Sequence, residues 1–256
     1  MSPGGPGRRL LGPVALVALA VALGGCLPAP ATEQGQAVHD LWIAFLVPAG
    51  VVAAIVWGLV TISIVRGWRR RPEAGLPDQV TGHTGLEIVW TTLPILTVVV
   101  LFALSLLALG RIDAKAAGGI DVTVTAFRWQ WQMDYPADGV SVVGTPDTPP
   151  VMVVPVGEPV HVTLQSRDVA HSFFVPQFLF KRDAIPGQPN HFDLTVETPG
   201  TYRGQCAEFC GIYHDRMLFS VEAVSPEAFD AWLASAAAGA STAPGASASP
   251  AGSAAP

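Results

Sequence analysis

Two long apolar stretches dominate the N-terminal half of the chain. Leu41–Val65 contains 25 residues and Ile88–Gly110 contains 23, and neither stretch has a charged side chain. At ~1.5 Å of rise per residue, helices of this length reach roughly 35 Å, which is enough to cross the hydrocarbon layer of a bilayer. We predict transmembrane helices over residues 41–65 and 87–110. The alternative is a helical hairpin buried in a soluble protein, and two uncharged stretches of this length argue against it.

After the second stretch, apolar and polar residues alternate in short runs. Residues 121–126 and 159–165 alternate with a period of two, and Pro/Gly turns separate such runs. This pattern predicts an all-β sandwich or barrel, which we place over residues 118–235 with a short terminal helix from Pro226 to Ser235. Residues 236–256 are mostly Ala, Ser, Gly and Pro, which cannot build a core, and we predict a disordered tail.

The first 25 residues have the pattern of a bacterial signal peptide. Arg8 and Arg9 precede an apolar run over residues 10–23, and Gly-Gly-Cys26 follows. Leu-small-small-Cys resembles the lipobox of bacterial lipoproteins, which implies cleavage before Cys26 and acylation of its thiol. The alternatives are an uncleaved anchor and an ordinary signal sequence.

Basic residues between the two apolar stretches predict the orientation in the membrane. Arg66 and Arg69 to Arg71 lie in the loop over residues 66–86, and such clusters mark the cytoplasmic side. Segment 26–40 and the β-domain are then extracytoplasmic, as a cleaved signal peptide also requires. We predict a multi-pass protein of the bacterial plasma membrane with its β-domain on the periplasmic side.

Composition and charge agree with this division. Half of the residues are hydrophobic and only 13% are charged. From Ile112 onward there are 15 acidic and 7 basic residues, a net charge of −8. An acidic domain argues against nucleic acid as a partner and favours a basic protein, although acidity can also serve solubility alone.

A cluster of potential metal ligands lies near the C-terminal end of the β-domain. Cys206, Cys210, His214 and Met217 fall within twelve residues. Thiolate and thioether are soft ligands and imidazole suits copper, whereas structural zinc sites use Cys and His without Met. A second histidine is needed, and spacing alone leaves three candidates, of which His171 has the best position; the other two are His161 and His191.

Two interpretations of the cysteines compete with a copper pair. One cysteine with two histidines and a methionine makes a mononuclear blue-copper site, whereas two thiolates can bridge two copper ions. A disulfide between Cys206 and Cys210 is plausible outside the cytoplasm, but it leaves His214 and Met217 without a role.

These motifs resemble subunit II of the haem-copper cytochrome c oxidases, and the similarity runs from about His39 to Leu233. It is carried by four stretches: residues 86–94 (LEIVWTTLP), 168–173 (DVAHSF), 181–187 (KRDAIPG) and 199–211 (PGTYRGQCAEFCG). The resemblance implies a two-helix transmembrane hairpin followed by an extracytoplasmic cupredoxin-like β-sandwich. That sandwich holds a dinuclear copper A centre in the family.

The resemblance also implies roles for individual residues. The copper ligands are His171, Cys206, Cys210, His214 and Met217, together with the backbone carbonyl of Glu208. The carboxylate of Glu208 binds a magnesium ion shared with subunit I.

Three further residues match functional positions of the family. Trp129, in an aromatic cluster that otherwise suggests core packing, is where the donor's electron enters; family members often have Trp-Tyr-Trp here, and this chain has Gln130 in the middle. Glu87 matches a glutamate that feeds protons into a channel in the family, although an ionisable group at a membrane boundary can simply anchor a helix. Asp168 matches an acidic residue that docks the donor in the family.

The function implied is that of an oxidase subunit in a complex with subunit I and further subunits. It accepts electrons from cytochrome c and passes them to the haem of subunit I, where oxygen is reduced to water with proton pumping; that haem and a second copper site belong to subunit I. A quinol oxidase subunit should lack the copper ligands, and nitrous oxide reductase needs a propeller domain that does not fit this length. A membrane-tethered copper chaperone gives Glu87 and Trp129 no role.

Overall fold

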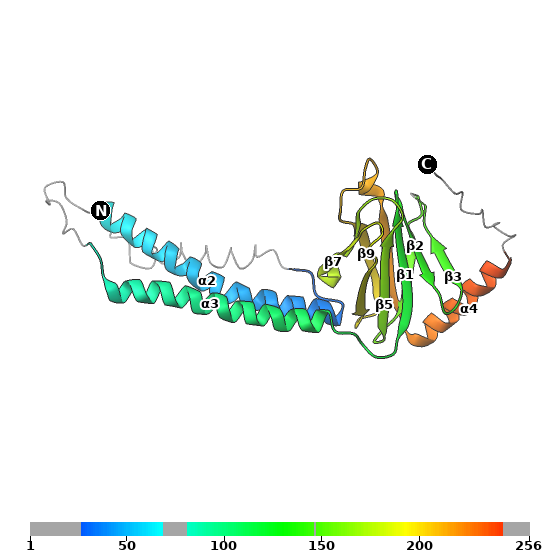
Figure 1. Cartoon of the computed structure of the whole chain (residues 1–256), viewed down its shortest axis with the longest axis horizontal. Helices are drawn as coiled ribbons and strands as arrows, with labels where there is room; N and C mark the ends of the chain where they lie inside the picture. The colour runs from blue at the N-terminus through cyan, green and yellow to red at the C-terminus, as the bar shows by residue number, and fades with distance from the viewer. Residues whose placement is uncertain (1–26, 69–80, 146, 243–256) are drawn as a thin grey trace, which may run out of the picture.

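The computed structural model describes residues 27–68, 81–145 and 147–242, which form a helical hairpin, a β-sandwich and a C-terminal helix (Figure 1). The predicted fold class is confirmed. The predicted signal peptide with Cys26, most of the predicted cytoplasmic loop and the last fourteen residues of the predicted tail lie outside the described residues.

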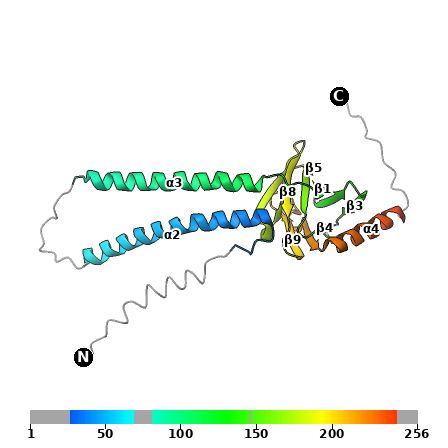
Figure 2. The ribbon, with the colours of Figure 1, turned by 90° about the horizontal axis from the view of Figure 1, so that it is seen from below.

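The hairpin consists of α2 (Glu33–Trp68) and α3 (Thr84–Ile112), and both helices are long and apolar enough to cross a membrane. Their apolar side chains point outward from the chain, with Trp57 69% exposed and Leu107 66% exposed. Such a surface needs lipid or a partner protein around it. The helices contact each other near the sandwich and diverge toward their far ends (Figure 2).

Both helices extend beyond the apolar stretches that predict them. α2 begins eight residues before Leu41 because its first turn, which includes the buried Gln34 and Gly35, lies against the sandwich. There the side-chain oxygen of Gln34 accepts a hydrogen bond of 3.1 Å from the backbone N–H of Thr195. Segment 26–40, predicted as a separate N-terminal segment, is therefore in large part the start of this helix.

The sandwich contains two five-stranded sheets. The first has the order β3-β2-β1-β5-β8 and the second the order β4-β10-β9-β6-β7. The first sheet comprises β1 (Ile120–Phe127), β2 (Gln130–Tyr135), β3 (Val140–Val143), β5 (Pro159–Ser166) and β8 (Asn190–Thr195). The second comprises β4 (Val151–Pro155), β6 (His171–Val175), β7 (Phe180–Ala184), β9 (Gly200–Cys206) and β10 (Leu218–Val224).

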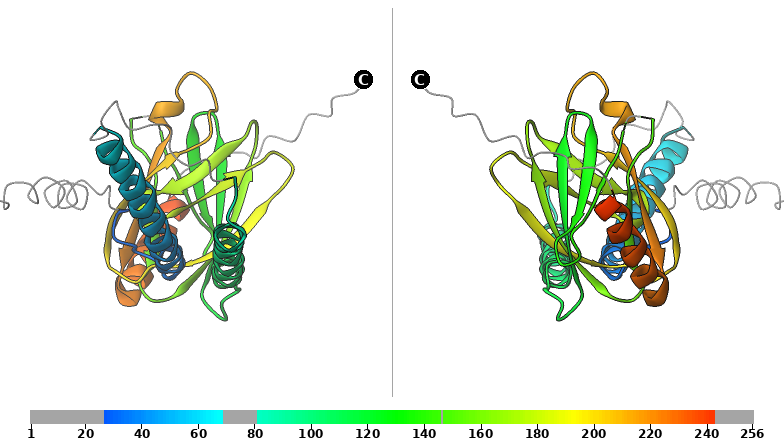
Figure 3. Two further views of the ribbon diagram at one scale, coloured as in Figure 1. Left: turned by 90° about the vertical axis from the view of Figure 1, so that its left-hand side faces the viewer. Right: turned by 90° about the vertical axis from the view of Figure 1, so that its right-hand side faces the viewer.

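The two sheets face each other (Figure 3), and alternating residues along the strands are buried between them. In β5, for example, Val160, Val162 and Leu164 are buried while the residues between them are partly exposed. β1 pairs with β5 and β4 pairs with β10 in parallel, and the other strand pairs are antiparallel. Tyr135 joins the two sheets, since its hydroxyl accepts from the N–H of Val153 and donates to the carbonyl of the same residue, both at 2.8 Å.

Short 3-10 turns and the last helix complete the domain. η2 (Pro176–Phe178) follows β6, and η3 (His214–Arg216) lies in the β9–β10 connection. α4 (Pro226–Thr242) packs Phe229 and Trp232 against Tyr135. This helix continues past Ser235, where we predicted the tail to begin, because alanine is the strongest helix former.

Candidate metal centre

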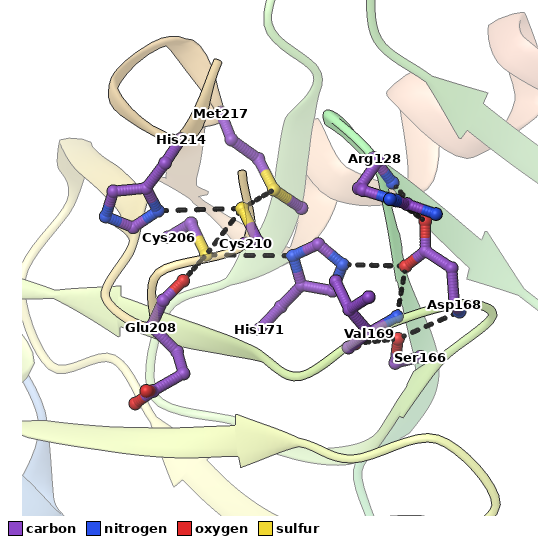
Figure 4. Close-up of polar contacts among 10 residues, drawn as sticks. All are labelled: Arg128, Ser166, Asp168, Val169, His171, Cys206, Glu208, Cys210, His214 and Met217. Carbon is purple, nitrogen blue, oxygen red and sulfur yellow. Dashed lines mark hydrogen bonds and ion pairs between the residues drawn. The ribbon is translucent and has the colours of Figure 1, made fainter. Parts of the chain in front are cut away.

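Five potential ligands come together at one end of the second sheet (Figure 4). His171 is the first residue of β6, and Cys206 is the last residue of β9. These strands are antiparallel neighbours with Phe173 opposite Cys206. The pairing therefore brings together two side chains that are 35 residues apart in the sequence. Cys210, His214 and Met217 follow in the loop that leads into β10.

The donor atoms of the other three residues lie around the sulfurs of the two cysteines. The Sγ atoms of Cys206 and Cys210 are 3.9 Å apart. Nδ1 of His171 lies 3.8 Å from the Cys206 sulfur, and Nδ1 of His214 lies 3.6 Å from the Cys210 sulfur. Sδ of Met217 is 3.8 Å from the Cys210 sulfur. Each thiol thus has one imidazole beside it, an arrangement with two similar halves.

Burial and chemistry select a soft metal for this cluster. His171 and Met217 are completely buried, and Cys206 and Cys210 are 4% and 6% exposed. Both thiols are free at a separation far above the ~2.05 Å of a disulfide bond. Thiolate, imidazole and thioether together suit copper, and a closed zinc site does not use methionine. The residues present therefore fit copper.

The two thiols differ in acidity although they share one cluster. Burial raises the pKa of Cys206, but hydrogen bonding to His171 and to nearby backbone groups outweighs it and lowers this pKa. Burial raises the pKa of Cys210, and the charge of Cys206 raises it further. One thiolate thus forms readily, and the second requires a nearby cation, such as a metal ion, to hold it.

Asp168 lies behind His171 on the side away from the sulfurs. Its Oδ1 atom accepts from the N–H of Val169 at 2.7 Å and lies 2.9 Å from Nε2 of His171. Its Oδ2 atom accepts from the backbone N–H of Arg128 at 2.8 Å and from Nε of Arg128 at 3.2 Å. Burial raises the pKa of Asp168, but these hydrogen bonds, that from His171 above all, lower it to about 2.

Glu208 presents its backbone and its side chain to different surroundings. Its carbonyl oxygen lies 3.2 Å from the Cys206 sulfur. Its carboxylate points away from the sulfurs (Figure 4) and pairs with Lys181 at 3.6 Å while 46% exposed. The carbonyl is therefore beside the predicted metal cluster, and the carboxylate is available to an ion or a partner outside it.

Trp129 lies against the loop that carries the ligands. Its ring meets Tyr213 edge to face at 4.9 Å between centroids. A Cβ atom added to Gly211 would come within 3.1 Å of the indole, and φ of this glycine is +128°, so a side chain is disfavoured there for two reasons. The indole is partly exposed, and the loop that contains Gly211 and Tyr213 connects it to the buried sulfurs.

The other predicted histidines are held elsewhere. His161 lies between Asp193 and the carbonyl of Gly118, and His191 contacts the hydroxyl of Thr163. Among the three candidates, only His171 has its ring at the sulfurs.

Glu87 lies far from this centre, near the start of α3 at the end of the hairpin remote from the sandwich (Figure 1). Its carboxylate accepts from the N–H of His83 at 3.1 Å, while Nδ1 of His83 accepts from the N–H of Leu86 at 3.1 Å. These reciprocal bonds cap the helix. Glu87 thus has a structural contact in addition to its predicted role.

The sequence did not identify Arg128, Tyr213 or Trp131 as part of the site. Trp131 is completely buried, and its indole N–H donates to the carbonyl of Met217 at 3.4 Å. Gly211, directly after Cys210, was the available signal that another part of the chain comes close to this loop. Nothing in the sequence points to Arg128, because its partner Asp168 is 40 residues away.

Comparison with known proteins gives consistent matches. Residues 143–224 match the family model described as cytochrome C oxidase subunit II, periplasmic domain. The chain is 32% identical to the probable cytochrome c oxidase subunit 2 of Streptomyces avermitilis, over 81% of this chain and 77% of the relative. It is 32% identical to cytochrome c oxidase subunit 2 of Alkalihalophilus pseudofirmus, over 80% and 60% respectively. Among solved structures, the periplasmic domain of subunit II of cytochrome oxidase from Bradyrhizobium japonicum is 30% identical, with a TM-score of 0.44 over 49% of this chain and 96% of that chain.

Proposed function

Because this chain belongs to the cytochrome c oxidase subunit II family, we propose that it is the subunit through which electrons enter a haem-copper terminal oxidase. It is a membrane protein with an extracytoplasmic domain and part of an oxidase complex. In this proposal it accepts electrons from cytochrome c at a dinuclear copper A centre. It passes them to the haem of subunit I, where oxygen is reduced to water with proton pumping.

The observation that carries the proposal is the cluster of two free, buried thiols, each with an imidazole beside it. We propose that His171, Cys206, Cys210, His214 and Met217 hold the copper pair, with the carbonyl of Glu208. A copper pair bound there supplies one-electron redox chemistry. Burial of His171, Met217 and the two thiols limits water at the site, which lowers the reorganisation that accompanies each change of charge.

Trp129 is our candidate for the point where the donor's electron enters. Its indole packs against Tyr213 and Gly211, both in the ligand loop. A short path through packed atoms therefore runs from the partly exposed ring toward the buried sulfurs.

Two further sites belong to the same proposal. The carboxylate of Glu208 would bind magnesium at the contact with subunit I, and its partial exposure leaves it accessible. Glu87 would supply protons from the cytoplasmic side, and Glu87→Gln, which can still accept from His83, tests this. Turnover that stays unchanged across pH would show that Glu87 acts only as a helix cap. For Cys26, acylation stays a prediction from the sequence.

The experiment that tests the central proposal replaces both Cys206 and Cys210 with Ser in the assembled oxidase. We expect loss of bound copper from this subunit, of the electron paramagnetic resonance signal of an electron shared over two copper nuclei, and of oxygen consumption with cytochrome c. Bound copper and oxygen consumption that survive the double change would refute it.

A further inference from the structure

We infer that Asp168 is a positioning residue that holds the copper ligand His171 and the backbone next to Trp129 in one fixed arrangement. The resemblance to the family implies a different task, that of an exposed acid docking a basic donor. The inference deepens the proposed function and rests on it, since it presupposes copper at His171.

The first step concerns the proton of His171. A carboxylate only accepts hydrogen bonds, so Nε2 of His171, 2.9 Å from Asp168, carries the ring proton. In the neutral ring, which is the form that binds a metal, Nδ1 then has a free lone pair, and it faces the Cys206 sulfur at 3.8 Å. Asp168 thus selects the tautomer and ring orientation in which His171 can bind a metal.

The second step concerns the strand connection that carries Trp129. The other carboxylate oxygen of Asp168 accepts from the backbone N–H and Nε of Arg128, the residue directly before Trp129. Asp168 therefore joins the β1–β2 connection of the first sheet to β6 of the second sheet (Figure 4). The side chain of Asp168 therefore contacts both the proposed copper ligand His171 and the residue next to Trp129, the proposed entry point of the electron.

The third step shows that Asp168 is itself held rigidly. It lies in the short turn between β5 and β6, where its N–H contacts Oγ of Ser166 at 3.3 Å and that hydroxyl donates to the carbonyl of Val169. The side chain is only 22% exposed. A carboxylate that accepts four hydrogen bonds and pairs with an adjacent guanidinium offers little free charge to a donor protein.

The test compares Asp168→Asn with Asp147→Asn, which removes an equal charge from an exposed residue before β4. An amide has the shape of the carboxylate but cannot accept from Arg128 and from His171 at the same time. We expect Asp168→Asn to weaken copper binding by the full-length chain in detergent by about 10- to 100-fold. We also expect altered copper hyperfine splitting once the protein is loaded.

Kinetics separate positioning from docking. In the assembled oxidase, we expect Asp168→Asn to lower the maximal rate at saturating cytochrome c, with the salt dependence of KM unchanged. Arg128→Gln keeps the backbone bond to Asp168 and should have a smaller effect of the same kind. Thermal unfolding of each variant, measured in parallel, shows whether the spectral change occurs in folded protein.

The inference is overturned if Asp168→Asn binds copper with wild-type affinity and spectrum and raises KM in a salt-dependent manner, as a docking charge would. Wild-type chain without a copper-pair signal would instead refute the proposed function, so the two failures are distinct.

Discussion

Two histidines of the sandwich each pair with an aspartate at 2.9 Å, yet their surroundings suit opposite purposes. His171 faces Asp168 with one ring nitrogen and a sulfur with the other. His161 faces Asp193 with one nitrogen and the carbonyl of Gly118, at 2.6 Å, with the other. The two histidines differ in the atom that faces the second ring nitrogen. In His171 that atom is a sulfur, which can share a metal with the nitrogen. In His161 it is a carbonyl oxygen, which can only accept a hydrogen bond from a protonated nitrogen.

At the linker end, His161 therefore faces two acceptors, and its protonated form can donate to both. With both nitrogens protonated, it ties β5 to the segment between α3 and β1. Asp193 contributes to the same connection, since its other oxygen accepts from the N–H of Ala116 at 2.8 Å. At the ligand end, we propose that a histidine–carboxylate pair orients a metal ligand. A histidine beside an acid is thus not in itself a sign of a metal site.

Changing each of the two histidines to Gln tests this difference directly and should give the largest effect. His171→Gln removes a proposed ligand, and we expect copper binding by the full-length chain to fall roughly 100-fold or more, since loss of an outer-shell partner alone costs about 10- to 100-fold. His161→Gln should bind copper as the wild type does. Copper titration followed by absorption measures both, and equal losses in the two variants would contradict the distinction.

A smaller effect is expected at the linker from Asp193→Asn. The carboxylate is 11% exposed and accepts from two groups on different segments. Leaving one of them without its partner should lower the free energy of unfolding of the β-domain by about 1–3 kcal/mol. Denaturant unfolding followed by tryptophan fluorescence measures the change.

His191→Gln is the matched control for Asp193→Asn, because His191 is an exposed residue of the same strand whose side chain forms one hydrogen bond, to the hydroxyl of Thr163, in the described part of the chain. If His191→Gln lowered the free energy of unfolding as much as Asp193→Asn does, the contacts of Asp193 would have no specific stabilising role.

The smallest expected effect is a dependence of stability on pH. The hydrogen bond to Asp193, followed by that to the Gly118 carbonyl, raises the pKa of His161 above 6.5, and Asp121 adds to this while burial opposes it. A group with a raised folded-state pKa stabilises fully below its unfolded value and loses that contribution as pH rises through the folded value. The melting temperature of the β-domain should therefore fall as pH increases above about 6.5. His161→Gln should flatten this slope, and an unchanged slope would assign it to other groups.

Local patterns predicted the elements and most of the proposed ligands, whereas contacts between distant segments were out of reach. Apolar length identified the cores of α2 and α3, but it could not show that α2 begins at Glu33, where the helix leaves its apolar part and packs on the sandwich. Cys206 to Met217 were recognisable because they are close in sequence. The partner histidine stayed open by spacing because β6–β9 pairing determines it, and Arg128 was missed for the same reason.

The hairpin is mounted on the sandwich at two separate places. Before α2, Ala31 exchanges backbone hydrogen bonds with Gln177 and Glu197, and after α3, Asp113 pairs with Arg182 at 2.7 Å. One contact alone would allow the domain to rotate about it, and a second contact restricts that rotation. Contacts within the chain thus help to set how the proposed metal centre is oriented relative to the two membrane-spanning helices.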